Sequence, residues 1–169
     1  IKSYINNLKD ERIKYFRTKE FIPVTDNWNR ALDLSTGDYL IMLGDDDCLM
    51  KDYFIKMKNL INKHNHPEVI YSSAYLYAYP NVLPNNKKGY LHPFSLGRIF
   101  KSKRNPFFLD PLTAHNLVES SLDFKIKFDF NMQFFLVKKE LICYLKKYGK
   151  FYQSPYPDYY ASNTLLLMS

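Results

Sequence analysis

Three consecutive carboxylates, Asp45, Asp46 and Asp47 (the aspartate triplet), follow the apolar run 39–43 after a single glycine, Gly44. We expect this run to form a buried strand with the triplet at its carboxyl end, which is where open α/β sheets bind ligands. Burying unpaired carboxylates is costly, so such a cluster needs a cation or a donor nearby. Clustered hard oxygen ligands suit Mg²⁺ or Mn²⁺, commonly shared with a phosphate-bearing substrate. The alternative interpretation is a solvated loop that caps the following helix.

The residues around the triplet carry a longer pattern. Asn29 and small residues lie on a predicted helix, Gly-Asp-Tyr follows at 37–39, and the apolar pair Leu49-Met50 comes soon after the aspartates. This arrangement resembles glycosyltransferase family 2. The resemblance implies the GT-A fold and transfer of a sugar from a nucleotide-diphosphate donor.

A second element lies near the carboxyl end of the chain. It reads Gly-Lys-Phe-Tyr at 149–152, followed by Pro-Asp-Tyr-Tyr at 157–160. In the family, an acidic residue at this place begins a helix that faces the acceptor. The two elements together extend the resemblance over about residues 10–65 and 135–169.

The resemblance implies roles for the triplet. Asp47 is the preferred metal ligand, and Asp45 with Asp47 supplies the Asp-x-Asp pair of the family. In the alternative family form, Asp-x-Asp-Asp, Gly44 stands where the first aspartate would be. We expect one of Asp45 and Asp46 to contact the donor ribose or to support the metal. The implied ligands are Mn²⁺ or Mg²⁺ and a nucleotide sugar, with a UDP-sugar expected first.

Asp158 is the expected catalytic base, because an acceptor hydroxyl is a poor nucleophile at neutral pH. Its local sequence also allows a second role, since Pro-Asp often opens a helix with the aspartate as its cap. The family commonly has Glu-Asp here, whereas this chain has Pro157 before Asp158. Asn29 and Arg30 are placed to reach the donor diphosphate from their helix, and Arg30 is equally well explained as a solvent-facing charge.

The resemblance implies metal-assisted transfer to an acceptor hydroxyl with inversion, and nothing in the sequence suggests a covalent nucleophile. The acceptor would be a sugar or a lipid-linked saccharide, in polysaccharide or glycoconjugate synthesis. One alternative is a non-catalytic sugar- or nucleotide-binding domain of the same fold. Another is a metal-dependent nucleotidyltransferase, although the Gly-rich phosphate loop usual in such enzymes is not visible in the sequence.

Composition limits the kinds of ligand and partner that the chain is expected to bind. Lys and Arg number 24 against 17 Asp and Glu, for a net charge of +7, and aromatic residues make up 17% of the chain. Aromatic rings stack on both sugars and bases, so they do not separate these ligands. No nucleic-acid-binding motif is recognisable, and we expect no nucleic-acid partner. Cys48 and Cys143 give no disulfide framework.

The alternation of helical and strand patterns predicts an α/β protein with a mixed central sheet flanked by helices. Asp26 is the expected N-cap of the helix that carries Trp28, a predicted core residue, and Gly37 is its expected stop. Helices are predicted at 1–8, 26–36, 52–64 and 138–148, strands at 12–17, 39–43, 68–77, 124–132 and 134–137, and loop with short helices at 80–118.

Residues 1–169 are interpreted as a single partial catalytic domain of the GT-A type, truncated at both ends. The chain begins directly in a predicted helix and stops within the apolar stretch 164–168. The resemblance implies that the first strand and a C-terminal part are missing. We expect a cytoplasmic protein, with peripheral association at the inner face of the membrane where the acceptor is lipid-linked.

Overall fold

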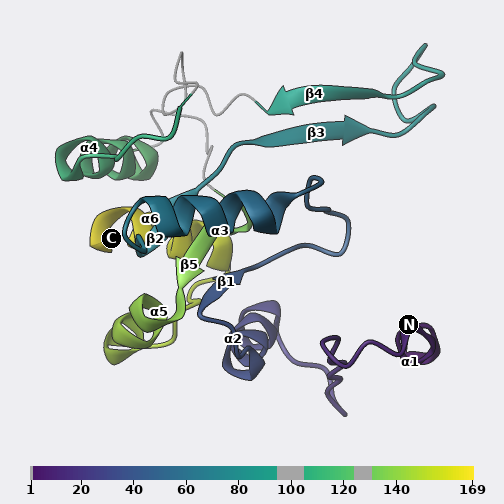
Figure 1. Cartoon of the computed structure of the whole chain (residues 1–169), viewed down its shortest axis with the longest axis horizontal. Coiled ribbons are helices and arrows are strands. Elements are labelled where there is room, and N and C mark those ends of the chain that lie inside the picture. Colours follow the sequence, from purple (N-terminus) through teal and green to yellow (C-terminus); the bar gives the residue numbers. More distant parts are fainter. Residues whose placement is uncertain (1, 95–104, 124–130) are drawn as a thin grey trace.

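The computed structural model describes residues 2–94, 105–123 and 131–169 (Figure 1). The described elements include both helices and strands, as expected for an α/β chain, but all described strand pairs are antiparallel, so the predicted mixed sheet is not seen among them. The helices are α1 (Lys2–Leu8), α2 (Val24–Leu34), α3 (Tyr53–Lys63), α4 (Pro111–Leu122), α5 (Lys139–Leu145) and α6 (Pro157–Met168), with short 3-10 helices η1 (Met132–Phe134) and η2 (Lys146–Tyr148). The strands are β1 (Tyr39–Ile41), β2 (Val69–Tyr71), β3 (Ala74–Ala78), β4 (Tyr90–Phe94) and β5 (Phe135–Lys138).

A three-stranded sheet in the order β1-β5-β2 lies at the centre of the molecule (Figure 1). The middle strand, β5, is antiparallel to both neighbours, so β1 and β2 run in the same direction on either side of it. Val137 pairs with Leu40 on one side and with Val69 on the other. Because β5 is paired on both edges, its side chains are the most buried of the sheet, and Phe135 and Val137 are 0% exposed.

The hydrophobic core forms mainly around β5 and the C-terminal helices. Leu165 of α6 is 0% exposed, Ile142 of α5 is 2% exposed, and the aromatic ring of Tyr152 is buried between these elements and α2. Trp28 packs edge-on against Tyr152 with ring centroids 5.3 Å apart, in agreement with its predicted core role. Each such side chain contributes about 1.5–3 kcal/mol when fully buried.

The predicted strand at 12–17 is wrong. A turn occupies residues 11–12, and the chain then runs without regular structure, with Ile13, Tyr15 and Phe16 all exposed. Asp10 accepts hydrogen bonds from the side chain and backbone of Arg12, which lower its pKa to about 2. A β-prone sequence forms a strand only when a partner strand satisfies its backbone, and none of the described strands pairs with this segment.

The limits of α2 also differ from the prediction. The helix begins at Val24 with Pro23 as N-cap, so Asp26 lies in its first turn and is not the cap. The negative charge of Asp26 still complements the helix N-terminus, and its carboxylate accepts a hydrogen bond from the Lys150 amine at 2.8 Å. The helix ends at Leu34, three residues before the predicted glycine stop, because its C-cap is Ser35.

Helix α3 occupies almost the predicted range, but its apolar stripe is only partly covered. Tyr53 and Met57 are half-buried, whereas Phe54 is 66% exposed. The predicted strand at 68–77 divides into β2 and β3. The backbone N–H of Ser72 still bonds the carbonyl of Phe134, but from Ala74 the chain pairs with β4 in a separate sheet.

The C-terminal third agrees better with the prediction. Strand β5 lies within one residue of the predicted strand, and α5 with η2 fills the predicted helix up to Gly149, whose φ of 130° suits glycine. The predicted alternating strand at 124–132 falls mostly outside the described residues. The predicted loop at 80–118 is corrected, since it contains β4 and most of α4.

Strands β3 and β4 form a separate antiparallel hairpin, in register from Ala74 opposite Phe94 to Ala78 opposite Tyr90. The hairpin runs along one side of α3 and ends in a long tip loop (Figure 1). In the described ranges, no helix has the length and apolar character needed to cross a bilayer.

Candidate functional site

The aspartate triplet lies on a turn directly beyond β1. The strand is shorter than predicted, with three half-buried residues, and Leu43 beyond it is already exposed. The backbone N–H of Asp47 bonds the Gly44 carbonyl at 3.4 Å, which closes the turn. All three carboxylates are exposed. The turn therefore presents negative charge to solvent at the end of a central-sheet strand, as the sequence predicted.

Gly44 is closely surrounded by polar side-chain atoms. A Cβ placed on it would lie 2.6 Å from Oδ2 of Asp47, 2.9 Å from Oδ1 of Asp46 and 2.8 Å from Nε2 of Gln133. The two carboxylates therefore fold back over the glycine, together with the Gln133 amide. A side chain at 44 would have to displace these three groups, which are the ends of flexible side chains, so the glycine leaves room for them beside its backbone.

Gln133 is a site residue that the sequence analysis missed. It lies on η1, and Oδ1 of Asn131 accepts a hydrogen bond from its backbone N–H at 3.0 Å. No local pattern marks it, because the triplet and Gln133 are almost ninety residues apart in sequence. Only the pairing of β1 with β5, which η1 directly precedes, brings the amide beside the carboxylates.

The triplet has the right donor atoms for a divalent cation but does not converge on one point. Among residues 2–94, 105–123 and 131–169, no three His, Cys, Asp or Glu side chains are grouped to hold a metal ion. Mg²⁺-type ions are often held by one or two carboxylates together with substrate phosphates and water. The exposed carboxylates of this turn fit that shared mode of binding better than an all-protein cage.

Asn29 has a structural role in this conformation. Its side chain is 8% exposed, and its Nδ2 donates to the carbonyls of Thr25 and Tyr152 at 2.9 and 2.8 Å. Its Oδ1 accepts the backbone N–H of Tyr152 at 3.0 Å. The two-point contact joins α2 to the segment before α6. Contact of Asn29 with the donor diphosphate stays a prediction.

Arg30, the next residue, is half-buried and makes no ion pair with any residue of the described ranges. Its guanidinium is therefore not committed to a structural partner as the Asn29 amide is. Asn29 and Arg30 are the two residues predicted to contact the diphosphate. Of the two, Arg30 is the one whose side chain can still hydrogen-bond a ligand.

Replacing Asn29 by alanine should lower the free energy of unfolding by about 2–4 kcal/mol, because the variant leaves the buried backbone groups of Tyr152 unpaired. Urea denaturation measures the change. Asn27 is exposed on the same helix, so Asn27→Ala is the matched control and should change stability by less than about 0.5 kcal/mol. Equal stability of the two variants would contradict the structural role of Asn29.

Asp158 lies in the first turn of α6. The N-cap of the helix is Tyr156 and Pro157 is its first residue, so the alternative interpretation of Asp158 as the cap is wrong. The residue is half-buried, and its carboxylate forms no ion pair within the part of the chain that the structure describes. Its charge complements the helix N-terminus and leaves its oxygens available to a ligand.

The 3-10 helix η1 lies next to both β1, which precedes the triplet, and α6, which carries Asp158. It contacts β1 and also packs against α6, and it carries Gln133 beside the triplet. The β1 turn and the α6 helix therefore share one neighbour. That Asp158 faces the triplet across a sugar-sized cleft stays a prediction.

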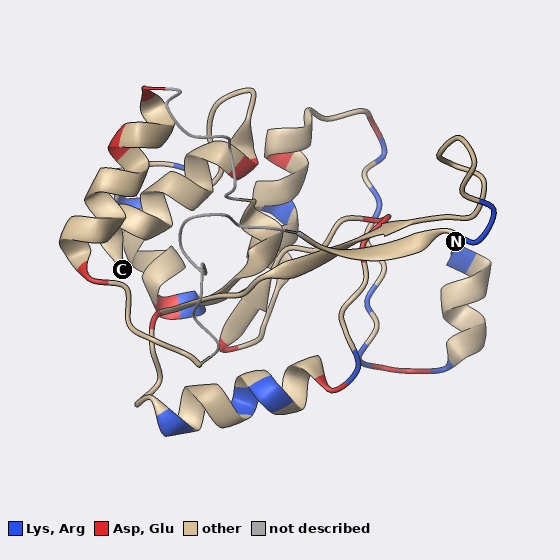
Figure 2. Cartoon of the chain, turned by 90° about the horizontal axis from the view of Figure 1, so that it is seen from above, with Lys and Arg blue, Asp and Glu red and all other residues tan. Residues whose placement is uncertain are grey.

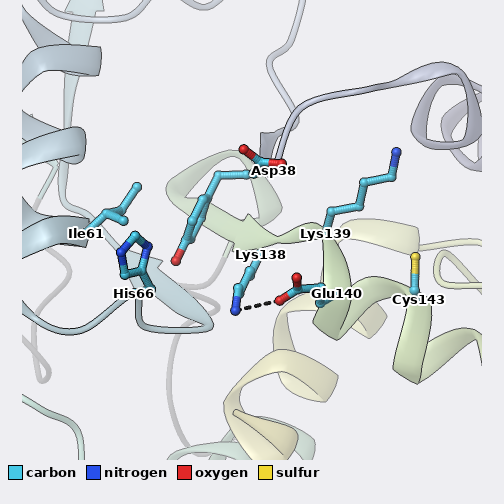
Figure 3. Close-up of a pocket in the computed structure, with 8 residues that line it drawn as sticks. Asp38, Ile61, His66, Lys138, Lys139, Glu140 and Cys143 are labelled. Atoms are coloured by element: carbon cyan, nitrogen blue, oxygen red, sulfur yellow. Dashed lines mark ion pairs between the residues drawn. The ribbon is translucent and has the colours of Figure 1, made fainter.

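A hollow of about 620 Å³ lies at the other end of β1 (Figure 3). Its polar groups are largely used within the protein. The Lys138 amine pairs with Glu140, whose hydrogen bond raises the lysine pKa, and the Lys139 amine donates to the Ser35 carbonyl at 2.8 Å. The Tyr39 hydroxyl donates to the Pro67 carbonyl at 2.7 Å. None of the residues that the sequence analysis assigned to the reaction lines this hollow.

Comparison with known families identifies the family of this chain. Residues 1–118 match the sequence profile described as Glycosyl transferase family 2. The chain belongs to this family. The match includes the aspartate triplet, Asn29 and Arg30, and ends before Asp158. Family membership implies the GT-A fold and supports glycosyl transfer, as the sequence motifs predicted. No curated protein and no solved structure gave a significant match.

Proposed function

We propose that this glycosyltransferase transfers a sugar from a nucleotide-diphosphate sugar, a UDP-sugar first, to an acceptor hydroxyl with the help of Mn²⁺ or Mg²⁺. The observation that carries the proposal is the exposed aspartate triplet at the end of β1, within the residues that match the family. A catalytic role explains why three adjacent carboxylates are kept together on one turn without a basic partner among the described residues.

Asp47 and Asp45 would hold the ion, and Asp46 would contact the donor ribose. A divalent ion bound there supplies positive charge to the diphosphate as the bond to the sugar breaks. Arg30 adds a fixed cation toward the same diphosphate, since its guanidinium is not used in an ion pair among the described residues. Gln133 is placed to orient Asp46 and Asp47 through its amide.

Asp158 would accept the proton of the acceptor hydroxyl as the oxygen attacks the anomeric carbon. A single displacement inverts the configuration at that carbon and needs no covalent intermediate. The carboxylate is half-buried and lacks an ion-pair partner in the described structure, which keeps its oxygens available for the proton. The proposed acceptor is a sugar or lipid-linked saccharide in glycoconjugate or polysaccharide synthesis, at the cytoplasmic face of a membrane in the lipid-linked case.

Incubation of the protein with UDP-sugars and Mn²⁺ should release UDP, and removal of the ion by EDTA should reduce the release by at least about tenfold. The released product is identified by ion-exchange chromatography. Release of pyrophosphate in place of nucleoside diphosphate would indicate a nucleotidyltransferase. Nucleotide binding without any turnover would indicate a binding domain of the same fold.

A further inference from the structure

The β3–β4 hairpin (residues 74–94) exposes apolar side chains on both faces. Tyr77 and Leu91 lie opposite each other on one face, and Leu76 lies on the other face opposite His92. Tyr77, Leu91 and Leu76 each keep at least half of their surface exposed. Contiguous apolar surface of this kind marks an interaction site more often than an ordinary solvated surface. The hairpin therefore presents an uncovered apolar surface to a partner.

The tip loop of the hairpin (residues 79–89) combines aliphatic and basic side chains. Val82 is 63% exposed and Leu83 is 42% exposed, and the nearby Lys87 and Lys88 are exposed as well. Figures 1 and 2 place the tip at the periphery of the molecule, with basic residues beside it. A planar surface could therefore meet these side chains without contacting the catalytic residues first.

Three hydrogen bonds within the tip loop satisfy part of its backbone. The N–H of Asn81 bonds the Asn86 carbonyl at 2.9 Å, and the N–H of Asn86 bonds the Leu83 carbonyl at 3.1 Å. The N–H of Val82 bonds the Tyr79 carbonyl at 3.3 Å. Internal pairing of this kind lowers the cost of moving a loop from water into a less polar environment.

Charge indicates the chemistry of the partner. Between Glu68 and Asp110 the sequence contains six Lys and Arg residues and no Asp or Glu. An anionic partner is therefore favoured. Aliphatic tip residues cannot stack on bases as aromatic rings do, whereas aliphatic side chains beside lysines and tyrosines are the combination that binds an anionic membrane interface.

We propose that the β3–β4 hairpin docks the protein on anionic lipid membranes. Val82 and Leu83 enter the headgroup region, Lys87 and Lys88 contact lipid phosphates, and Tyr79 lies at the interface between them. The hairpin would be the surface by which the protein reaches the membrane in the lipid-linked case of the proposed function. Docking itself does not depend on sugar transfer. Vesicle binding is measured without donor or acceptor, so its failure is distinguishable from a failure of the proposed reaction.

Co-sedimentation of the chain with vesicles tests the proposal. The protein should bind vesicles in which about a third of the phosphatidylcholine is replaced by phosphatidylglycerol, bind pure phosphatidylcholine weakly, and lose binding as salt is raised. Lys87→Gln with Lys88→Gln should weaken binding by roughly twenty-five-fold, because each lysine near an anionic surface contributes roughly fivefold. Val82→Ser with Leu83→Ser should weaken it by at least roughly tenfold.

Matched controls come from the exposed segment before α2 and from the first residue of that helix. Lys14→Gln with Lys19→Gln removes the same charge, and Phe21→Ser with Val24→Ser removes exposed apolar surface. Neither pair should change vesicle binding more than about twofold. Circular dichroism verifies that every variant is folded. Absence of wild-type binding, or equal losses in control and hairpin variants, would overturn the proposal. A hairpin-dependent dimer in lipid-free solution would also overturn it and assign the surface to a second copy.

Discussion

Replacing Asp158 by asparagine should lower the rate of sugar transfer by about 10²–10⁴-fold, the usual effect of removing a general base. The amide is isosteric with the carboxylate but cannot accept the acceptor proton. Nucleotide and Mn²⁺ binding should persist, because the triplet on the β1 turn is unchanged. Single-turnover transfer and a nucleotide titration, both on this chain or on any longer form that contains it, separate the two effects.

Glu119→Gln is a suitable control for this experiment. Glu119 is exposed on α4, which packs against α6, so the variant removes one negative charge from a neighbouring helix. Its transfer rate should remain within about twofold of the wild type. If Asp158→Asn transfers sugar at the wild-type rate, the carboxylate only complements the N-terminus of α6, and the base lies elsewhere.

Local sequence signals predicted the elements whose stability is decided locally. The apolar stripe of α3, the strand β5 and the helix that ends at Gly149 are all found close to their predicted limits. The aspartate turn was also predicted, because a carboxylate run cannot continue an apolar strand. For β5 and the helix before Gly149 the pattern and the final surroundings agree, whereas the α3 stripe, predicted as core, contains no fully buried residue.

Features that depend on distant partners could not be predicted in this way. Residues 12–17 have the composition of a strand but lack a partner among the described strands, and residues 74–78 leave the central sheet because they pair with β4. The Asn29 side chain is hydrogen-bonded to the backbone of Tyr152, which is more than a hundred residues away in the chain. Gln133 likewise reaches the triplet only through the pairing of β5 with β1. No local periodicity carries this information.

Asp47→Asn should abolish most of the stabilisation that Mn²⁺ gives the wild-type protein. Three adjacent carboxylates on one turn repel one another, and an ion bound there relieves the repulsion. At an Mn²⁺ concentration about 100 times the Kd, binding stabilises the folded state by about 2.7 kcal/mol, which corresponds to a rise in Tm of about 5–10 °C for a chain of this size. The variant should keep its metal-free Tm, because the Asp47 side chain is exposed.

Variants of the other carboxylates that flank β1 test whether the Mn²⁺ effect is specific to Asp47. Asp38 is exposed at the opposite end of the strand, so Asp38→Asn should retain the full Mn²⁺-dependent shift in Tm. If the Asp-x-Asp pair is Asp45 with Asp47, Asp45→Asn should lose the shift and Asp46→Asn should retain much of it. Asp47→Asn should also lose sugar transfer, together with Mn²⁺-dependent nucleotide binding, which distinguishes it from Asp158→Asn. An unchanged Mn²⁺ shift in Asp47→Asn would move the metal site away from the triplet.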